Sequence, residues 1–223
     1  MPDLTPERLA AIAIVLAVML LVAFPVHEFS HALAAYRLGD GTAKLFGRLT
    51  LDPRAHFDRM GGLLLVVSVF LSGGTSGFGW AKPTPVNPMH LRGGRSGEAL
   101  VAAAGPLSNL ALALIAALPL RYMLATRMDI PILLEALYFF VVINLFLMLF
   151  NLVPIPPLDG SKVLYAFLDP RTLWRVRPVL EQYGTLVFLV LVFFPIFGGQ
   201  TLFGVLSSVV VRPLIGFLIG VQV

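Results

Sequence analysis

The sequence predicts an all-α polytopic membrane protein: a bundle of about five to six transmembrane or re-entrant helices with a small membrane-associated β-hairpin or strand region. Apolar residues make up 58% of the 223 residues and charged residues only 13%, against about 45–50% and about 25% in a soluble domain. The mean hydropathy is +0.89. A soluble protein of this composition would expose large apolar patches to water, so soluble and disordered classes are excluded.

The first predicted span is the uncharged run Leu9–Val26, which is long enough to cross most of a bilayer. It continues directly into a cluster of ionisable residues that begins at His27. We expect one long helix over residues 8–38, bent near Pro25 because proline disrupts the helical hydrogen-bond ladder. Gly39 is expected to end it.

The next stretch has a different pattern. Residues 43–52 alternate apolar and polar side chains, which is the period of a β-strand. Leu63–Leu71 is apolar but too short to span, so it predicts a re-entrant or partial helix. Residues 72–97 are rich in glycine and proline and predict a loop that holds another short strand at most.

Four further apolar runs complete the predicted bundle. They are Ala99–Leu120, Ile130–Val153, Leu186–Phe197 (in a helix that begins near Gln182) and Leu202–Val221, which Arg212 and Pro213 interrupt. Because there is no internal repeat and no soluble extension, we expect residues 1–223 to form a single membrane domain, with the additional C-terminal spans at about 180–222.

The basic residues predict the orientation. Eight of them lie in residues 37–97 and four in residues 154–178, whereas residues 121–129 hold only two. Positive charge concentrates in cytoplasmic loops, so both segments are predicted to be cytoplasmic. We therefore expect an integral protein of a prokaryotic cell membrane whose chemistry faces the cytoplasm. The net charge of +4 is attributed to this topology, and no nucleic-acid partner is expected.

His27, Glu28 and His31 form an H-E-x-x-H motif on the first predicted helix. Histidines four residues apart are offset by ~6 Å along the axis and ~40° around it, so both rings can reach one ion. Zn²⁺ suits two His nitrogens and a carboxylate, and Glu28 can act as a general base outside the ligand set. Ionisable residues next to an apolar span are costly unless they have a function.

Asp159 is the candidate third ligand. It follows three prolines within residues 154–157, which break the third long helix where the chain would otherwise leave the membrane. The alternative is that Asp159 caps the helix that begins near Ser161. His56 and His90 lie in predicted loops, where histidine is generally solvated, and the chain has no cysteine ligand to offer.

Together these segments resemble the site-2 protease family of intramembrane zinc metalloproteases. The resemblance rests on H-E-x-x-H, on N-x-x-P-x-x-P-L-D-G at 151–160 and on A-G-P-x-x-N at 104–109, which looks like a helix start. It covers roughly residues 20–165 and implies a catalytic core at about 8–165. It further implies that His27, His31 and Asp159 bind Zn²⁺ and that Glu28 is the catalytic base. Many relatives carry an earlier span and a PDZ or CBS domain, and this chain is expected to be a minimal member without them.

The sequence leaves two roles open for Asn151. Its amide could stabilise the oxyanion of a tetrahedral intermediate, or it could bind the last carbonyl groups of the third long helix. Asn109 and Asn144 are expected to form interhelical hydrogen bonds.

The expected partners are single-span membrane protein substrates and the lipid bilayer, and the oligomeric state is left open. Residues 43–52 are expected to offer a strand edge to an unwound substrate. One alternative function is a non-proteolytic zinc transporter or sensor that uses the same His/His/Asp site. Another is a different zinc peptidase with a glutamate as third ligand.

The predicted topology can be tested by cysteine labelling, because the chain has no cysteine of its own. We expect single substitutions His90→Cys and Arg171→Cys to be protected from an impermeant reagent in intact cells. Arg127→Cys, in the predicted extracytoplasmic turn, should be labelled. If positions 90 and 171 label differently, Asp159 and the histidine pair do not share a membrane face.

Overall fold

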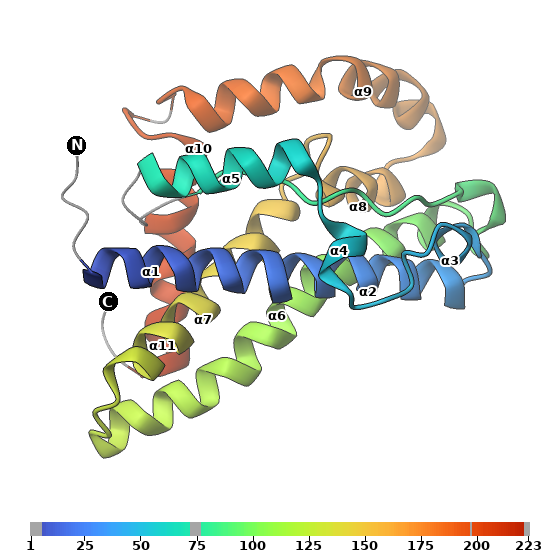
Figure 1. Cartoon of the computed structure of the whole chain (residues 1–223). Helices are drawn as coiled ribbons and strands as arrows, with labels where there is room; N and C mark the ends of the chain where they lie inside the picture. The colour runs from blue at the N-terminus through green and yellow to red at the C-terminus, as the bar shows by residue number, and fades with distance from the viewer. Residues whose placement is uncertain (1–5, 72–76, 197, 221–223) are drawn as a thin grey trace.

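The structure is a computed structural model that describes residues 6–71, 77–196 and 198–220. Its regular structure over these ranges is helical (Figure 1). Five helical segments among them are long and apolar enough to cross a membrane: Ile12–Arg37, Arg95–Thr126, Pro131–Asn151, Pro170–Phe193 and Leu202–Ile219. These segments correspond to the five long runs in the sequence, with helix ends that differ by several residues.

The N-terminal span consists of α1 (Pro6–Ala17), a π-helical turn η1 (Val18–Ala23) and α2 (Phe24–Arg37). Pro25 sits in the first turn of α2, directly after η1. A proline ring clashes with the carbonyl group four residues earlier in an α-helix, and a wider π turn relieves that clash. The expected disturbance near Pro25 is therefore a π turn. After α2, Gly39 has φ +107° and turns the chain away.

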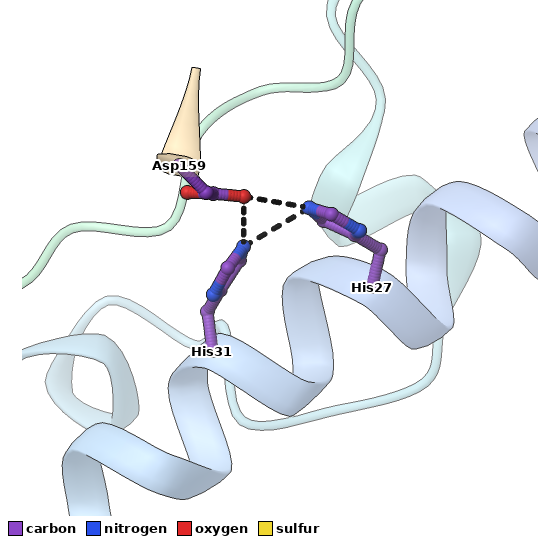
Figure 2. Close-up of side chains that lie close together, drawn as sticks. All are labelled: His27, His31 and Asp159. Atoms are coloured by element: carbon purple, nitrogen blue, oxygen red, sulfur yellow. Dashed lines mark hydrogen bonds and ion pairs between the residues drawn. The ribbon is translucent and has the colours of Figure 1, made fainter. Parts of the chain in front are cut away.

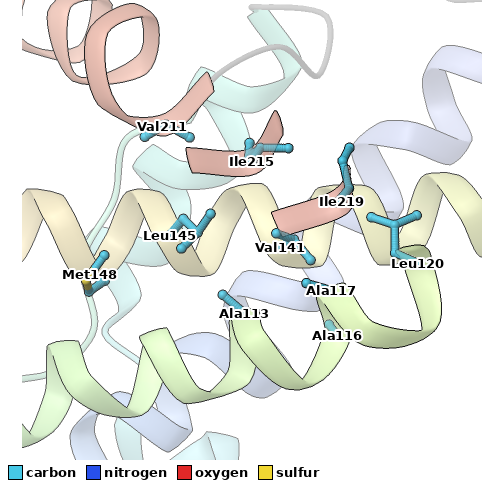
Figure 3. Packing of buried hydrophobic residues seen from close by; sticks show 10 residues of the cluster. All are labelled: Ala113, Ala116, Ala117, Leu120, Val141, Leu145, Met148, Val211, Ile215 and Ile219. Carbon is cyan, nitrogen blue, oxygen red and sulfur yellow. The ribbon is translucent and has the colours of Figure 1, made fainter. Parts of the chain in front are cut away.

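The centre of the bundle is the contact between α6 (Arg95–Thr126), α7 (Pro131–Asn151) and the last span. The last span is built as α10 (Leu202–Val205), the π turn η3 (Leu206–Val211) and α11 (Arg212–Ile219). Alanines on α6 let these helices approach closely. Figure 3 shows the buried side chains of this cluster: Ala113, Ala116, Ala117, Leu120, Val141, Leu145, Met148, Val211, Ile215 and Ile219.

Two further helices flank this centre. The short apolar helix α5 (Arg59–Leu71) packs Leu65 and Val69 in a cluster with α1, η1 and α7, and its length is below that of a full span, as the sequence predicts. Helix α9 (Pro170–Phe193) contributes Phe188 and Val192 to a separate cluster with α7 and α10. The turn between α6 and α7 lies at the opposite end of the bundle from α3 and α8 (Figure 1).

The predicted β-hairpin or strand region is wrong. Residues 43–52 contain the end of a helical turn α3 (Thr42–Leu45) and a turn at Gly47, where φ is +68°, and the described ranges contain no strand. The side chains also depart from the predicted alternation of faces, because Leu45 is 87% exposed whereas Arg48 is 5% exposed. Arg48 is buried because its guanidinium donates to the carbonyl oxygen of Ala55 in α4 (Pro53–His56). The strand edge expected to receive substrate is therefore missing from residues 43–52.

Candidate metal centre

Three ligand-type side chains from two helices meet in the structure. His27 and His31 lie on α2, and Asp159 is the first residue of α8 (Asp159–Phe167). Nε2 of His27 and Nε2 of His31 lie 3.2 Å and 3.1 Å from Oδ2 of Asp159, and the two nitrogens are 3.0 Å apart (Figure 2). Both histidines are only 7% exposed. A metal-binding group thus forms from residues 132 positions apart in sequence.

These distances fit a zinc ion. Ligand atoms at zinc–nitrogen distances in a tetrahedral arrangement lie about 3.3 Å apart, so small shifts of the three side chains would complete the set. The donor types, two imidazoles and one carboxylate, are those of catalytic zinc sites, which leave a fourth position for water. Within the described ranges this is the one group of three or more such side chains placed to hold a metal.

The second nitrogen of each imidazole is also held. Nδ1 of His31 donates to the carbonyl oxygen of Val101 at 2.7 Å, and Nδ1 of His27 donates to Oδ1 of Asn109 at 2.6 Å. The amide of Asn109 donates in turn to Oδ1 of Asn144 at 2.9 Å. With Nδ1 protonated, each Nε2 lone pair is free to face the metal position, a common arrangement around histidine ligands.

Gly105 makes room for the centre on the facing helix. A β-carbon at this position would lie 2.4 Å from Nε2 of His31 and 2.6 Å from Nε2 of His27. The A-G-P-x-x-N segment at 104–109 lies inside α6, which starts at Arg95, so the expected helix start at this motif is wrong. Pro106 is tolerated within the helix because membrane helices can satisfy the freed backbone groups through their neighbours.

The capping alternative for Asp159 finds no support in the structure. The N-cap of α8 is Leu158, without a side-chain hydrogen bond, and the Asp159 carboxylate points at the histidines. A β-carbon at Gly160 would lie 2.2 Å from the carbonyl oxygen of Leu152, so the start of α8 is packed tightly onto the end of α7. This close approach aims Asp159 inward.

The charge state of Asp159 also suits a ligand. Burial alone would raise the pKa of this carboxyl, but when the histidines carry protons in place of a metal ion, attraction to His31 and hydrogen bonds from His27 and His31 hold it well below its ordinary value. A bound cation would act on this pKa in the same direction. Asp159 is therefore ionised at neutral pH, the form in which a carboxylate coordinates a cation.

The other candidate residues occupy different places. Glu28 is half-buried next to the ligands, and its Oε2 accepts a hydrogen bond from the Thr84 N–H at 2.8 Å. The Asn151 amide donates to the carbonyl oxygen of Leu147 at 3.0 Å, so it caps its own helix here, and its oxyanion role stays a prediction. His56 is buried and hydrogen-bonded to the carbonyl oxygen of Thr50, which corrects the expectation of a solvated ring.

Several residues that contribute to the site were not predicted from the sequence. The carbonyl group of Val101 is a main-chain acceptor, which no residue type announces. Gly105 belongs to the A-G-P-x-x-N motif, yet only the structure shows that it faces the histidines. Thr84 lies in the glycine- and proline-rich stretch 72–97, which the sequence predicts as a loop without singling out this residue.

Comparison with known proteins identifies the family of the chain. Residues 125–195 match the family model described as Peptidase family M50. The protein "Putative zinc metalloprotease YwhC" of Bacillus subtilis (strain 168) is 39% identical over 198 residues, which cover 86% of this chain and 86% of that protein. The chain belongs to peptidase family M50. The resemblance to site-2 proteases inferred from the motifs is thereby confirmed.

Other M50 relatives are longer than this chain. "Putative zinc metalloprotease Rip2" of Mycobacterium tuberculosis (strain ATCC 25618 / H37Rv) is 34% identical over 183 residues, covering 80% of this chain and 66% of that protein. The protein of the same name from Mycolicibacterium smegmatis is 31% identical over 176 residues, with 78% and 65% covered. No solved structure matches the chain significantly.

The ligand set predicts the metal content of variants. We expect His27→Ala, His31→Ala and Asp159→Ala each to lose most bound zinc in detergent-purified protein, because a site with three protein ligands cannot easily spare one. Asp129→Ala, exposed in the turn between α6 and α7, is the control and should keep wild-type zinc. Elemental analysis per mole of protein measures both, and full occupancy in Asp159→Ala would place the third ligand elsewhere.

The close approach of α6 predicts a second, purely steric effect. Gly105→Ala should weaken zinc binding by about tenfold or more, since its β-carbon would press on both imidazoles. Gly41→Ala is the matched control, because a β-carbon there meets no atom within 4 Å. Zinc titration against a competing chelator compares the two variants, and equal affinities would show that α6 can retreat from α2.

Proposed function

We propose that this member of family M50 is an intramembrane zinc metalloendopeptidase that hydrolyses peptide bonds in or near transmembrane segments of single-span membrane proteins. The observation that carries the proposal is the convergence of His27, His31 and Asp159 beside Glu28, within a bundle of apolar helices. Family membership and the zinc metalloprotease names of the relatives support the same reaction class.

The residues of the centre have separable tasks. His27, His31 and Asp159 would hold Zn²⁺, which when bound lowers the pKa of a water molecule and polarises the scissile carbonyl group. Glu28 is the general base: its carboxylate takes a proton from the attacking water and passes it to the leaving amine nitrogen. Asn109 and the Val101 carbonyl keep the two imidazoles in the orientation that ligation needs.

The proposal also covers the membrane face of the centre and the conformation of the substrate. The centre is formed by the C-terminal half of the first span and by α8, which follows the third span. The excess of basic residues in segments 37–97 and 154–178 favours the cytoplasm of a prokaryotic cell for this side of the bundle. A substrate helix must unwind before cleavage, because its amide carbonyl groups are otherwise engaged in hydrogen bonds.

Neither the structure nor the named relatives support the transporter or sensor alternative. A transport path requires further ligands along its length, and the described ranges hold no second group of three or more ligand-type side chains. The relatives that match over most of this chain carry metalloprotease names.

Glu28→Gln is the decisive variant. It keeps the size of the side chain and a hydrogen-bond acceptor for Thr84 but removes the base, so cleavage should fall by about 10²–10⁴-fold or more. Zinc content should stay near wild type, because the ligands are untouched. Purified protein is assayed for zinc and for cleavage of a single-span substrate whose helix contains Gly, Asn or Pro.

Glu135→Gln on α7 serves as the matched control, since this glutamate is remote in sequence from both motifs and lines a surface between α6, α7 and the last span. It should cleave at the wild-type rate. Equal cleavage by wild type and Glu28→Gln would remove the general base from the mechanism and leave the peptidase proposal without its central residue.

A further inference from the structure

Residues 77–87 form a segment without helix between α5 and α6, here called the strap, which contacts α2 at Glu28, next to His27 of the metal centre. Its first part is packed tightly on α5. The N–H group of Phe78 donates to the Ser68 hydroxyl, and a β-carbon at Gly79 would lie 2.5 Å from the carbonyl oxygen of Gly61. Small residues thus hold the start of the strap against the short helix.

The other end of the strap is fixed by Asp40, whose side chain is fully buried beyond the end of α2. Its carboxylate accepts hydrogen bonds from the N–H groups of Asn87 at 2.7 Å and Thr42 at 3.0 Å. Burial alone would raise the pKa of Asp40, but the hydrogen bonds from Thr42 and Asn87 hold it below its ordinary value. The strap is therefore anchored on both sides of the catalytic glutamate.

Thr84 stands between these anchors and contacts Glu28 twice. Its N–H group donates to Oε2 of the Glu28 carboxylate at 2.8 Å, and its hydroxyl donates to the main-chain carbonyl oxygen of Glu28 at 3.0 Å. Thr84 thus hydrogen-bonds to both the side chain and the backbone of Glu28. This pair of contacts restricts the rotation of the carboxylate about its own side-chain bonds.

The sequence around Thr84 makes this contact specific. Pro83 and Pro85 have no N–H group, so Thr84 carries the single main-chain donor of the three-residue stretch. Each proline fixes its own φ, and Pro85 also keeps Thr84 out of the helical region. The stretch is stiff before Glu28 is engaged, which lowers the entropy lost in holding the carboxylate.

We infer that Thr84 is a positioning residue for the catalytic base: the strap holds Glu28 in the orientation from which it takes the proton of the attacking water. This inference rests on the proposed peptidase function. A base misplaced by about 1 Å can cost roughly 10²-fold in rate, so the contact matters for kcat rather than for zinc binding. Substrate binding to the strap would instead appear in KM.

The test compares three substitutions of Thr84 in the full-length purified protein. Thr84→Pro removes the N–H donor and the hydroxyl, Thr84→Val removes the hydroxyl alone, and Thr84→Ser keeps both. We expect kcat to fall by roughly 10- to 100-fold in Thr84→Pro and by less in Thr84→Val. Thr84→Ser should restore wild-type kcat, and zinc content and KM should stay near wild type in all three.

Thr126→Val is the matched control, because the Thr126 hydroxyl also binds a helix carbonyl group, that of Tyr122 at the far end of α6. It should leave kcat unchanged. If Thr84→Pro loses zinc, its fold has failed. The kcat of Thr84→Val, compared with that of Thr84→Ser, then tests the inference.

Unchanged kcat in Thr84→Pro with zinc retained would overturn the inference, as would a loss that Thr84→Ser fails to restore. A rise in KM at constant kcat would also overturn it and assign the strap to substrate binding. These results differ from failure of the peptidase proposal itself, in which wild-type protein shows no Glu28-dependent cleavage. In that case the positioning role falls with the function it serves.

Discussion

Burying a polar metal centre among apolar helices is the constraint on which the rest of the bundle depends. His27 and His31 are almost inaccessible, so each ring nitrogen needs a partner or a cation. The partners come from other spans: the carbonyl group of Val101 and the amide of Asn109 on α6, and behind Asn109 the amide of Asn144 on α7. Each hydrogen bond runs outward from the imidazole, and the series ends on the Phe140 carbonyl group. Satisfying the histidines therefore sets how α2, α6 and α7 lie against one another.

The grouping of His27, His31 and Asp159 could be predicted from the sequence because its signals are local and chemical. Two histidines one helical turn apart share a face, and a carboxylate beyond a proline-broken helix end has few other uses in a membrane protein. The partners of the ligands were less accessible. Gly105 and Val101 matter through the path of the backbone, which depends on how α6 crosses α2. Asn109 and Asn144 were correctly expected to bond between helices, but their link to His27 required the packed structure.

The failed strand prediction has an equally physical origin. Alternation predicts a strand only where one face is buried by a sheet, and residues 43–52 have no sheet to join. Their burial is decided by single polar anchors. Arg48 turns inward to reach the Ala55 carbonyl group, whereas the Leu45 side chain stays exposed. Long spans could be located from hydropathy because the bilayer imposes a length, but the short connecting segments follow individual hydrogen bonds.

The π turn η1 links the proline in the first span to the centre. A π turn inserts about one extra residue, which rotates the following helix by about 100° relative to an uninterrupted α-helix. Upstream, Ile12 and Val15 pack in the cluster that contains α5 and α7, and downstream the histidines face α6 and α8. The Ala23 carbonyl group, at the end of η1, accepts a 3.5 Å hydrogen bond from the Asn109 amide. The same asparagine therefore holds both His27 and the turn that aims it, so the irregularity in the helix belongs to the construction of the metal centre.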